Sequence, residues 1–294
     1  MNSPTLHNAW FKIAALLEMI KFSHTVFAFP FALMGVVLAA LASGAPPTPR
    51  QVLWICLAMV GARTGAMGLN RLIDARIDAA NPRTANRHIP TGSVRIGEAA
   101  LLVGGAFALL LVAAWQLNPL CLKLAPLAIF CLVLYSYCKR FTALAHLVLG
   151  LCLAAAPLGA WIAVRGDVGW PVLVLSLAVL FWVAGFDIFY ALQDRDFDRQ
   201  HGLHSIPARF GVAASFRIAR LFHLLMLGLL LLLGLMPGLG LIYLLGVATV
   251  AGLLGYEHRL VHPDDLSRLD AAFFNMNGYI SVTIFAFTLI DALL

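Results

Sequence analysis

The feature that most constrains this chain is a series of long apolar stretches, each holding only a few charged residues. Segments of roughly 17–25 apolar residues can cross a bilayer as α-helices, and in lipid only helices or closed barrels satisfy the backbone. The apolar runs are continuous rather than alternating, which favours helices over a barrel. Of the 294 residues, 62% are hydrophobic and 12% are charged, about half the charged share of an ordinary soluble domain. We therefore predict an all-α polytopic membrane protein.

We expect nine transmembrane helices, packed as a bundle in a single domain over residues 1–294. The predicted spans are 22–43, 52–75, 98–117, 119–137, 143–164, 170–192, 212–235, 238–256 and 271–293. Breaker residues, including Pro119 and Pro237, separate the spans that follow one another most closely.

The positions of the basic residues predict the orientation. Sixteen of the twenty lysines and arginines lie on one side, in the N-terminal segment, in the loops after spans two, four, six and eight, or in the adjoining parts of the spans; the others are Arg50, Arg63, Lys123 and Arg165. By the positive-inside rule we expect those loops to face the cytoplasm. We expect the protein to lie in the cytoplasmic (inner) membrane. The net charge of +6 follows from this bias and requires no nucleic-acid partner.

Two acidic motifs stand at the ends of spans two and six. Asn70, Asp74 and Asp78 are spaced i, i+4 and i+8, so on a continuous helix their oxygens share one face. Asp194 and Asp198 repeat the i, i+4 pair, 120 residues after Asp74 and Asp78 (194 − 74 = 120; 198 − 78 = 120). Each motif opens a long polar loop on the same side, which indicates a pseudo-repeat with the site where the halves meet.

Oxygen ligands in this pattern suit Mg²⁺, which usually keeps waters and is completed by substrate phosphates. Asp196 adds a further carboxylate to the second motif. The alternative is that the acids are solvated helix ends paired with neighbouring arginines, and the repetition in both halves argues against it. The sequence therefore predicts a magnesium site that binds phosphate.

Basic residues on the same side are candidates for holding a diphosphate, because arginine forks match its oxygens. They are Lys21, Arg83, Arg87, Lys139 and Arg140. The alternative is that positive-inside bias alone places them there. Arg83 and Arg87 are the stronger candidates because they follow Asp78 in the same loop.

Asp187 lies inside span six, seven residues before Asp194 and therefore on nearly the same helix face. An ionisable group within a span is costly, and it marks a functional site unless it has a structural partner; Lys21 or a buried hydroxyl would be such a partner. Tyr190 lies between Asp187 and Asp194 on the same helix.

These motifs resemble the signatures of the UbiA superfamily of intramembrane prenyltransferases. The first is Asn70-Arg71 with Asp74 and Asp78, followed by Arg83-Thr84-Ala85-Asn86-Arg87; the second is Gly185-Phe186-Asp187-Ile188-Phe189-Tyr190-Ala191 with Asp194 and Asp198. Tyr135, Lys139 and Arg140 fit a further pattern of the family.

The resemblance implies transfer of a polyprenyl group from a polyprenyl diphosphate to a hydroxylated aromatic acid in quinone biosynthesis. One Mg²⁺ would bind Asn70, Asp74 and Asp78, and a second Asp194 and Asp198 with support from Asp196. Asp187 would orient the acceptor or take a proton, and Tyr190 would shelter an allylic cation.

The acceptor implied is 4-hydroxybenzoate, for ubiquinone, or a dihydroxynaphthoate, for menaquinone. Arg71 and His204 depart from the hydroxybenzoate pattern, while the run Met19-Ile20-Lys21-Phe22-Ser23-His24 looks more like the menaquinone group. A secondary transporter is the alternative from another class, and a non-catalytic prenyl-lipid scaffold is a third. Oligomeric state is left open.

Overall fold

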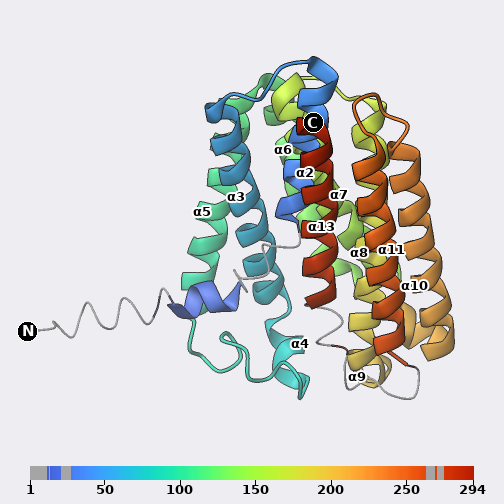
Figure 1. Cartoon of the computed structure of the whole chain (residues 1–294). Coiled ribbons are helices and arrows are strands. Elements are labelled where there is room, and N and C mark those ends of the chain that lie inside the picture. Colours follow the sequence, from blue (N-terminus) through green and yellow to red (C-terminus); the bar gives the residue numbers. More distant parts are fainter. Residues whose placement is uncertain (1–11, 13, 21–27, 263–268, 270–274) are drawn as a thin grey trace, which may run out of the picture.

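The computed structural model describes residues 12, 14–20, 28–262, 269 and 275–294. The described part of the chain is a bundle of long helices (Figure 1). The elements are α2 (Phe29–Ser43), α3 (Pro49–Ile73), α4 (Ala75–Ala80), α5 (Ile96–Leu117), α6 (Pro119–Cys138), α7 (Ala145–Arg165), α8 (Trp170–Ala191), η2 (Leu192–Asp194), α9 (Arg195–Gln200), α10 (Ile206–Leu233), α11 (Leu241–Leu260) and α13 (Asn277–Leu293).

Seven of these helices are long and apolar enough to cross a membrane: α3, α5, α6, α7, α8, α10 and α11. They correspond to the second to eighth predicted spans. The first and ninth predicted spans begin in residues outside the described part, and the described helices there, α2 and α13, are shorter apolar helices of 15 and 17 residues. The protein is thus an all-helical integral membrane protein, and the total of nine spans stays a prediction.

Close packing at small residues holds the helices together, because lipid supplies no hydrophobic force between them. A Cβ at Gly61 would stand 2.7 Å from the carbonyl oxygen of Ala106, so α3 lies directly against α5. At Gly150 the same atom would stand 2.4 Å from the carbonyl oxygen of Leu180, which joins α7 to α8 in the same way. α8 lies inside the bundle, and its Trp182 is fully buried.

The two acidic motifs lie at helix breaks rather than on continuous helices, which corrects the sequence-based expectation. α3 ends at Ile73, and Asp74 joins it to α4 with φ −92° and ψ 2°. Asp194 joins η2 to α9 with almost the same angles, φ −100° and ψ 1°. The amide of Asp78 still donates to the carbonyl of Asp74 at 2.7 Å, so helical spacing persists across the first break. The matching geometry of the two breaks is what the pseudo-repeat predicts.

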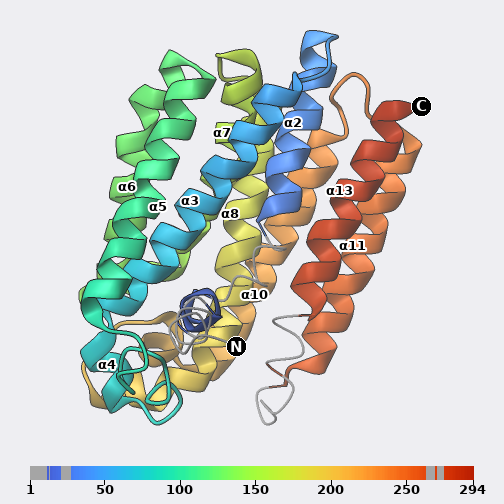
Figure 2. The same ribbon diagram turned by 90° about the vertical axis from the view of Figure 1, so that its left-hand side faces the viewer.

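α4 and α9 lie at the same end of the bundle, opposite the C-terminus (Figures 1 and 2). The loop that follows α4, residues 81–95, lies at this end as well, as Figure 2 shows. Segments more than a hundred residues apart in the sequence therefore meet there.

Candidate active site

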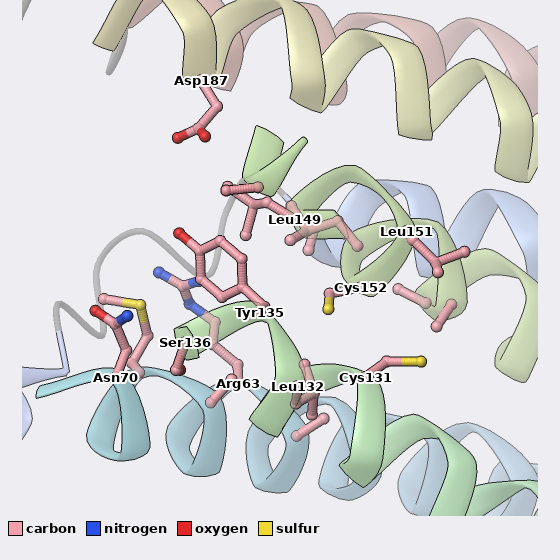
Figure 3. A pocket seen from close by; sticks show the side chains of 18 of the residues that line it. Arg63, Asn70, Cys131, Leu132, Tyr135, Ser136, Leu149, Leu151, Cys152 and Asp187 are labelled. Carbon is pink, nitrogen blue, oxygen red and sulfur yellow. The ribbon is translucent and has the colours of Figure 1, made fainter. Parts of the chain in front are cut away.

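A cavity of about 1290 Å³ runs between the helices and connects polar and apolar surroundings. At one end its lining includes Asp74, Asp78, Asp194 and Asp198. Farther inside, it is lined by side chains of α3, α6 and α7, among them Leu132, Leu149 and Cys152 (Figure 3). Such a space suits an amphiphile with an anionic head and a long hydrocarbon tail.

Asp74 is held by the basic residues that follow α6. Its side chain is 3% exposed, and one oxygen lies 2.5 Å from Nζ of Lys139 while the other accepts a 2.9 Å hydrogen bond from Arg140. Arg140 also donates to the carbonyl of Ile73 at 2.9 Å, which caps the end of α3. Asn70 donates to Asp74 at 3.1 Å. The predicted diphosphate-binding cations are therefore in contact with the first acidic motif.

Asp78 is equally enclosed, with its side chain 5% exposed. Arg87 donates to its Oδ1 at 2.7 Å, and Nη1 of Arg71 lies 4.0 Å from its Oδ2. That Oδ2 is buried and accepts no hydrogen bond within the described residues. A buried carboxylate oxygen with spare acceptor capacity is a ready ligand for a cation.

The second motif is bound by residues from the first half of the chain. Arg83 donates hydrogen bonds to both oxygens of Asp194, one from Nε at 2.8 Å and the other from Nη2. Asn81 adds a 2.8 Å hydrogen bond to Asp194, and Nη1 of Arg83 donates to the hydroxyl of Tyr190 at 2.9 Å. The loop after α4 thus brings the two motifs together.

Burial alone would lower the pKa of Arg83, but its hydrogen bonds to Asp194 and Tyr190 hold the pKa above the ordinary value. Arg83 is therefore positively charged where it contacts Asp194 and Tyr190.

Asp196 and Asp198 lie two residues apart on α9 and face different surroundings. Asp198 lines the cavity and accepts a 2.8 Å hydrogen bond from Ser205. The side chain of Asp196 is 70% exposed and pairs with Arg195 at 2.8 Å. The structure therefore places Asp196 at the surface, apart from the cavity where we expected it to support a metal.

Asp187 has a buried partner that the sequence reasoning missed. Nδ1 of His146 lies 2.7 Å from its Oδ2, and Nε2 of His146 accepts a 3.2 Å hydrogen bond from the amide of Ile206. Because the amide of Ile206 donates to Nε2, Nδ1 is the ring atom that donates to Asp187. His146 therefore aims the side chain of Asp187 into the cavity, as a partner that we did not consider.

The donor set fits a cation that also binds substrate. Among the described residues, no group of three or more His, Cys, Asp and Glu side chains forms a ready metal cage. Each motif offers two carboxylates to the cavity, and one of their oxygens, Oδ2 of Asp78, accepts no hydrogen bond within the described residues. Mg²⁺ is commonly held by one or two carboxylates, with waters and phosphates completing its coordination.

The cavity brings together Asn70, Arg83, Arg87, Lys139 and Tyr190 with the acids, while Arg140 reaches Asp74 from beside it. Lys21 lies outside the described residues. Arg63 also lines the cavity, although sequence reasoning set it apart from the cytoplasmic basic residues. The sequence did contain a signal for this position, because Arg63 precedes Asn70 by seven residues and therefore shares its helix face. Sequence reasoning also missed Asn81 and His146, because neither residue belongs to one of the motifs.

Comparison with known proteins agrees with this geometry. Residues 28–279 match the model of the UbiA prenyltransferase family. The chain belongs to the UbiA prenyltransferase family. A relative named 4-hydroxybenzoate octaprenyltransferase, from Nitrosospira multiformis, is 32% identical over 89% of this chain and 88% of its own length. A 4-hydroxybenzoate solanesyltransferase from Synechocystis is 34% identical over 71% of this chain and 70% of its own.

Solved structures share the fold of this prenyltransferase. The apo structure of a UbiA homologue from Aeropyrum pernix K1 is 33% identical with a TM-score of 0.83, covering 92% of this chain and 98% of that one. A UbiA homologue from Archaeoglobus fulgidus bound to GPP and Mg²⁺ is 17% identical with a TM-score of 0.76, covering 95% and 100%.

Proposed function

We propose that this membrane prenyltransferase transfers a polyprenyl group from a polyprenyl diphosphate to a hydroxylated aromatic acid, as in the 4-hydroxybenzoate step of ubiquinone biosynthesis. The observation that carries the proposal is the single cavity that joins both acidic motifs and their cations to an apolar interior. The names of the relatives support 4-hydroxybenzoate as the acceptor. A dihydroxynaphthoate, on the way to menaquinone, is the alternative acceptor for the same chemistry.

The diphosphate end of the site combines ligands for metal with cations for phosphate. Asn70, Asp74 and Asp78 would hold one Mg²⁺, and Asp194 and Asp198 a second. When bound, these ions would neutralise the charge that grows on the departing diphosphate. Arg83, Arg87 and Lys139, which contact the carboxylates, have long side chains that also reach phosphate oxygens. Preplaced cations of this kind stabilise a leaving group without reorganisation during the reaction.

The allylic C–O bond breaks with its electron pair leaving on the diphosphate. An aromatic carbon of the acceptor then bonds to the prenyl carbon, and that ring carbon loses its proton, which restores the aromatic ring. Tyr190 and Phe186 line the cavity and present aromatic faces to the allylic cation. Asp187, held in position by His146, would accept a hydrogen bond from the hydroxyl of the aromatic acid and is placed to take a proton from it or from the ring. The apolar walls keep water from the cation.

The site lies at the end of the bundle that carries the basic loops after α4 and α9. We infer a cytoplasmic membrane location with the loops after α4 and α9 facing the cytoplasm, where soluble aromatic acids are available. The acids lie at one end of the bundle, whereas the sites of secondary transporters usually lie near the membrane midplane, and this position argues against a transporter.

The test uses purified protein in detergent with Mg²⁺ and a polyprenyl diphosphate. 4-Hydroxybenzoate and a dihydroxynaphthoate are supplied separately, and prenylated product is measured by mass spectrometry. We expect product from one acceptor and its loss when EDTA removes the metal. Product that persists in EDTA would contradict the role of Mg²⁺. Folded protein that gives neither product nor diphosphate release would contradict the proposed activity.

A further inference from the structure

Arg63 is a charged residue in the interior of α3, a membrane-crossing helix. It precedes Asn70 by seven residues, which returns its side chain to nearly the same helix face, about 10 Å farther from α4. The side chain lines the same cavity as the acidic motifs. A charge at this depth is costly and is retained where it has a partner or a function.

The surroundings of Arg63 mark the boundary between the polar and apolar parts of the cavity. Figure 3 shows the side chains of Arg63 and of Tyr135 from α6 on one wall of the cavity, with Asp187 of α8 pointing in from the opposite wall. Leu132 and Cys152 lie on the apolar side. A planar ring placed between Arg63 and Asp187 would meet a cation at one edge and a carboxylate at the other.

The position of Arg63 sets it apart from the cations of the diphosphate end. Arg71, Arg83, Arg87 and Lys139 line the cavity too, and each is paired with an aspartate of the acidic motifs. Arg63 lies about two helical turns deeper than Asn70. The prenyl tail carries no charge, so the remaining anion of the reaction is the carboxylate of the aromatic acceptor.

We propose that Arg63 binds the carboxylate of the aromatic acid. This inference rests on the proposed function and deepens it. The guanidinium fork matches a carboxylate in two parallel hydrogen bonds, and Asp187 receives the hydroxyl at the other edge of the ring. Two opposite contacts fix which ring carbon faces the allylic cation. Arg63 thereby selects hydroxylated aromatic acids over phenols that lack the carboxylate.

The experiment compares Arg63→Gln with wild type on two acceptors: the aromatic acid that wild type accepts, and the same ring without its carboxylate. We expect Arg63→Gln to lower kcat/KM for the acid by roughly 10- to 100-fold, the value of a hydrogen-bonded charge. kcat/KM for the decarboxylated ring, already low in wild type because the ring lacks the carboxylate, should fall much less, so the preference for the acid shrinks; a thermal melt in detergent shows separately that the variant is folded. Arg63→Lys, which keeps the charge, recovers part of the loss, and KM for the prenyl diphosphate is unchanged.

Asp187→Asn is the matched control, because the hydroxyl it faces is present in both acceptors. It should lose the same factor on the two rings. An equal loss on both rings in Arg63→Gln, including complete inactivity, would overturn the role of Arg63, as would a raised KM for the prenyl diphosphate alone. If wild type itself prenylates no aromatic acid, the proposed function fails instead.

Discussion

The acidic turn at Asp74 and the acidic turn at Asp194 share backbone geometry and sequence spacing, yet they differ in their surroundings. The side chains of Asp74 and Asp78 are 3% and 5% exposed, whereas the side chain of Asp194 is 19% exposed. Cations from three separate segments enclose the first turn. The second depends on Asn81 and Arg83, which belong to the loop of the first half.

The difference shows that a repeat in the sequence need not give two equivalent sites. The first turn is a rigid, buried assembly that positions its carboxylates in advance. The second is completed by contact with the first, so its geometry depends on how the two halves dock. Substitutions at the first turn should therefore mainly lower the stability of the fold. Substitutions at the second turn should mainly disturb the contact between the two halves.

The largest effects are expected from Asp74→Ala and Asp194→Ala. Each removes a carboxylate at the diphosphate end, and turnover should fall at least about 10²- to 10³-fold. Asp74→Ala should also lower the melting temperature more, because it leaves Lys139 and Arg140 near each other without their anion. The loss in the free energy of unfolding should stay below the roughly 3–5 kcal/mol lost when one partner of a fully buried ion pair is removed, since the side chains of Lys139 and Arg140 are 31% and 29% exposed. Turnover and thermal melts in detergent test both points. Near-normal turnover by either variant would contradict the metal assignment.

Arg83→Lys should have an intermediate effect on turnover. Lysine keeps the charge but cannot donate two parallel hydrogen bonds to Asp194 and a third to Tyr190. We expect turnover to fall roughly 10- to 100-fold, the value of lost hydrogen bonds to a charged group. Arg195→Lys is the control, since its partner Asp196 is 70% exposed. Equal turnover by the two variants would show that docking of the halves does not depend on Arg83.

The smallest effect distinguishes the two acids of α9. Asp198→Asn should raise the Mg²⁺ concentration needed for half-maximal turnover, because Asp198 faces the cavity. Asp196→Asn should change that concentration by less than about twofold, since an exposed ion pair contributes only about 0–1 kcal/mol. A magnesium titration of both variants decides it. A similar rise in the required Mg²⁺ concentration in both variants would show that Asp196 also takes part in metal binding.

Sequence alone determined the membrane class, the seven long spans confirmed as helices and the clustering of acids with arginines. These follow from local properties: apolar length sets the spans, and fixed spacing from Asp74 to Asp78 sets a shared face even across the helix break. The positions of Asn70, Arg83 and Arg87 in the cavity were predicted for the same reason.

Only the tertiary structure decided which groups face one another across the bundle. His146 meets Asp187 because α7 packs against α8 through Gly150, and Arg63 and Asp187 share one cavity because α3 and α8 both line it. The exposure of Asp196 likewise depends on how α9 docks. Such pairings join residues tens to hundreds of positions apart, and their distances depend on helix packing that residue spacing within one segment does not encode.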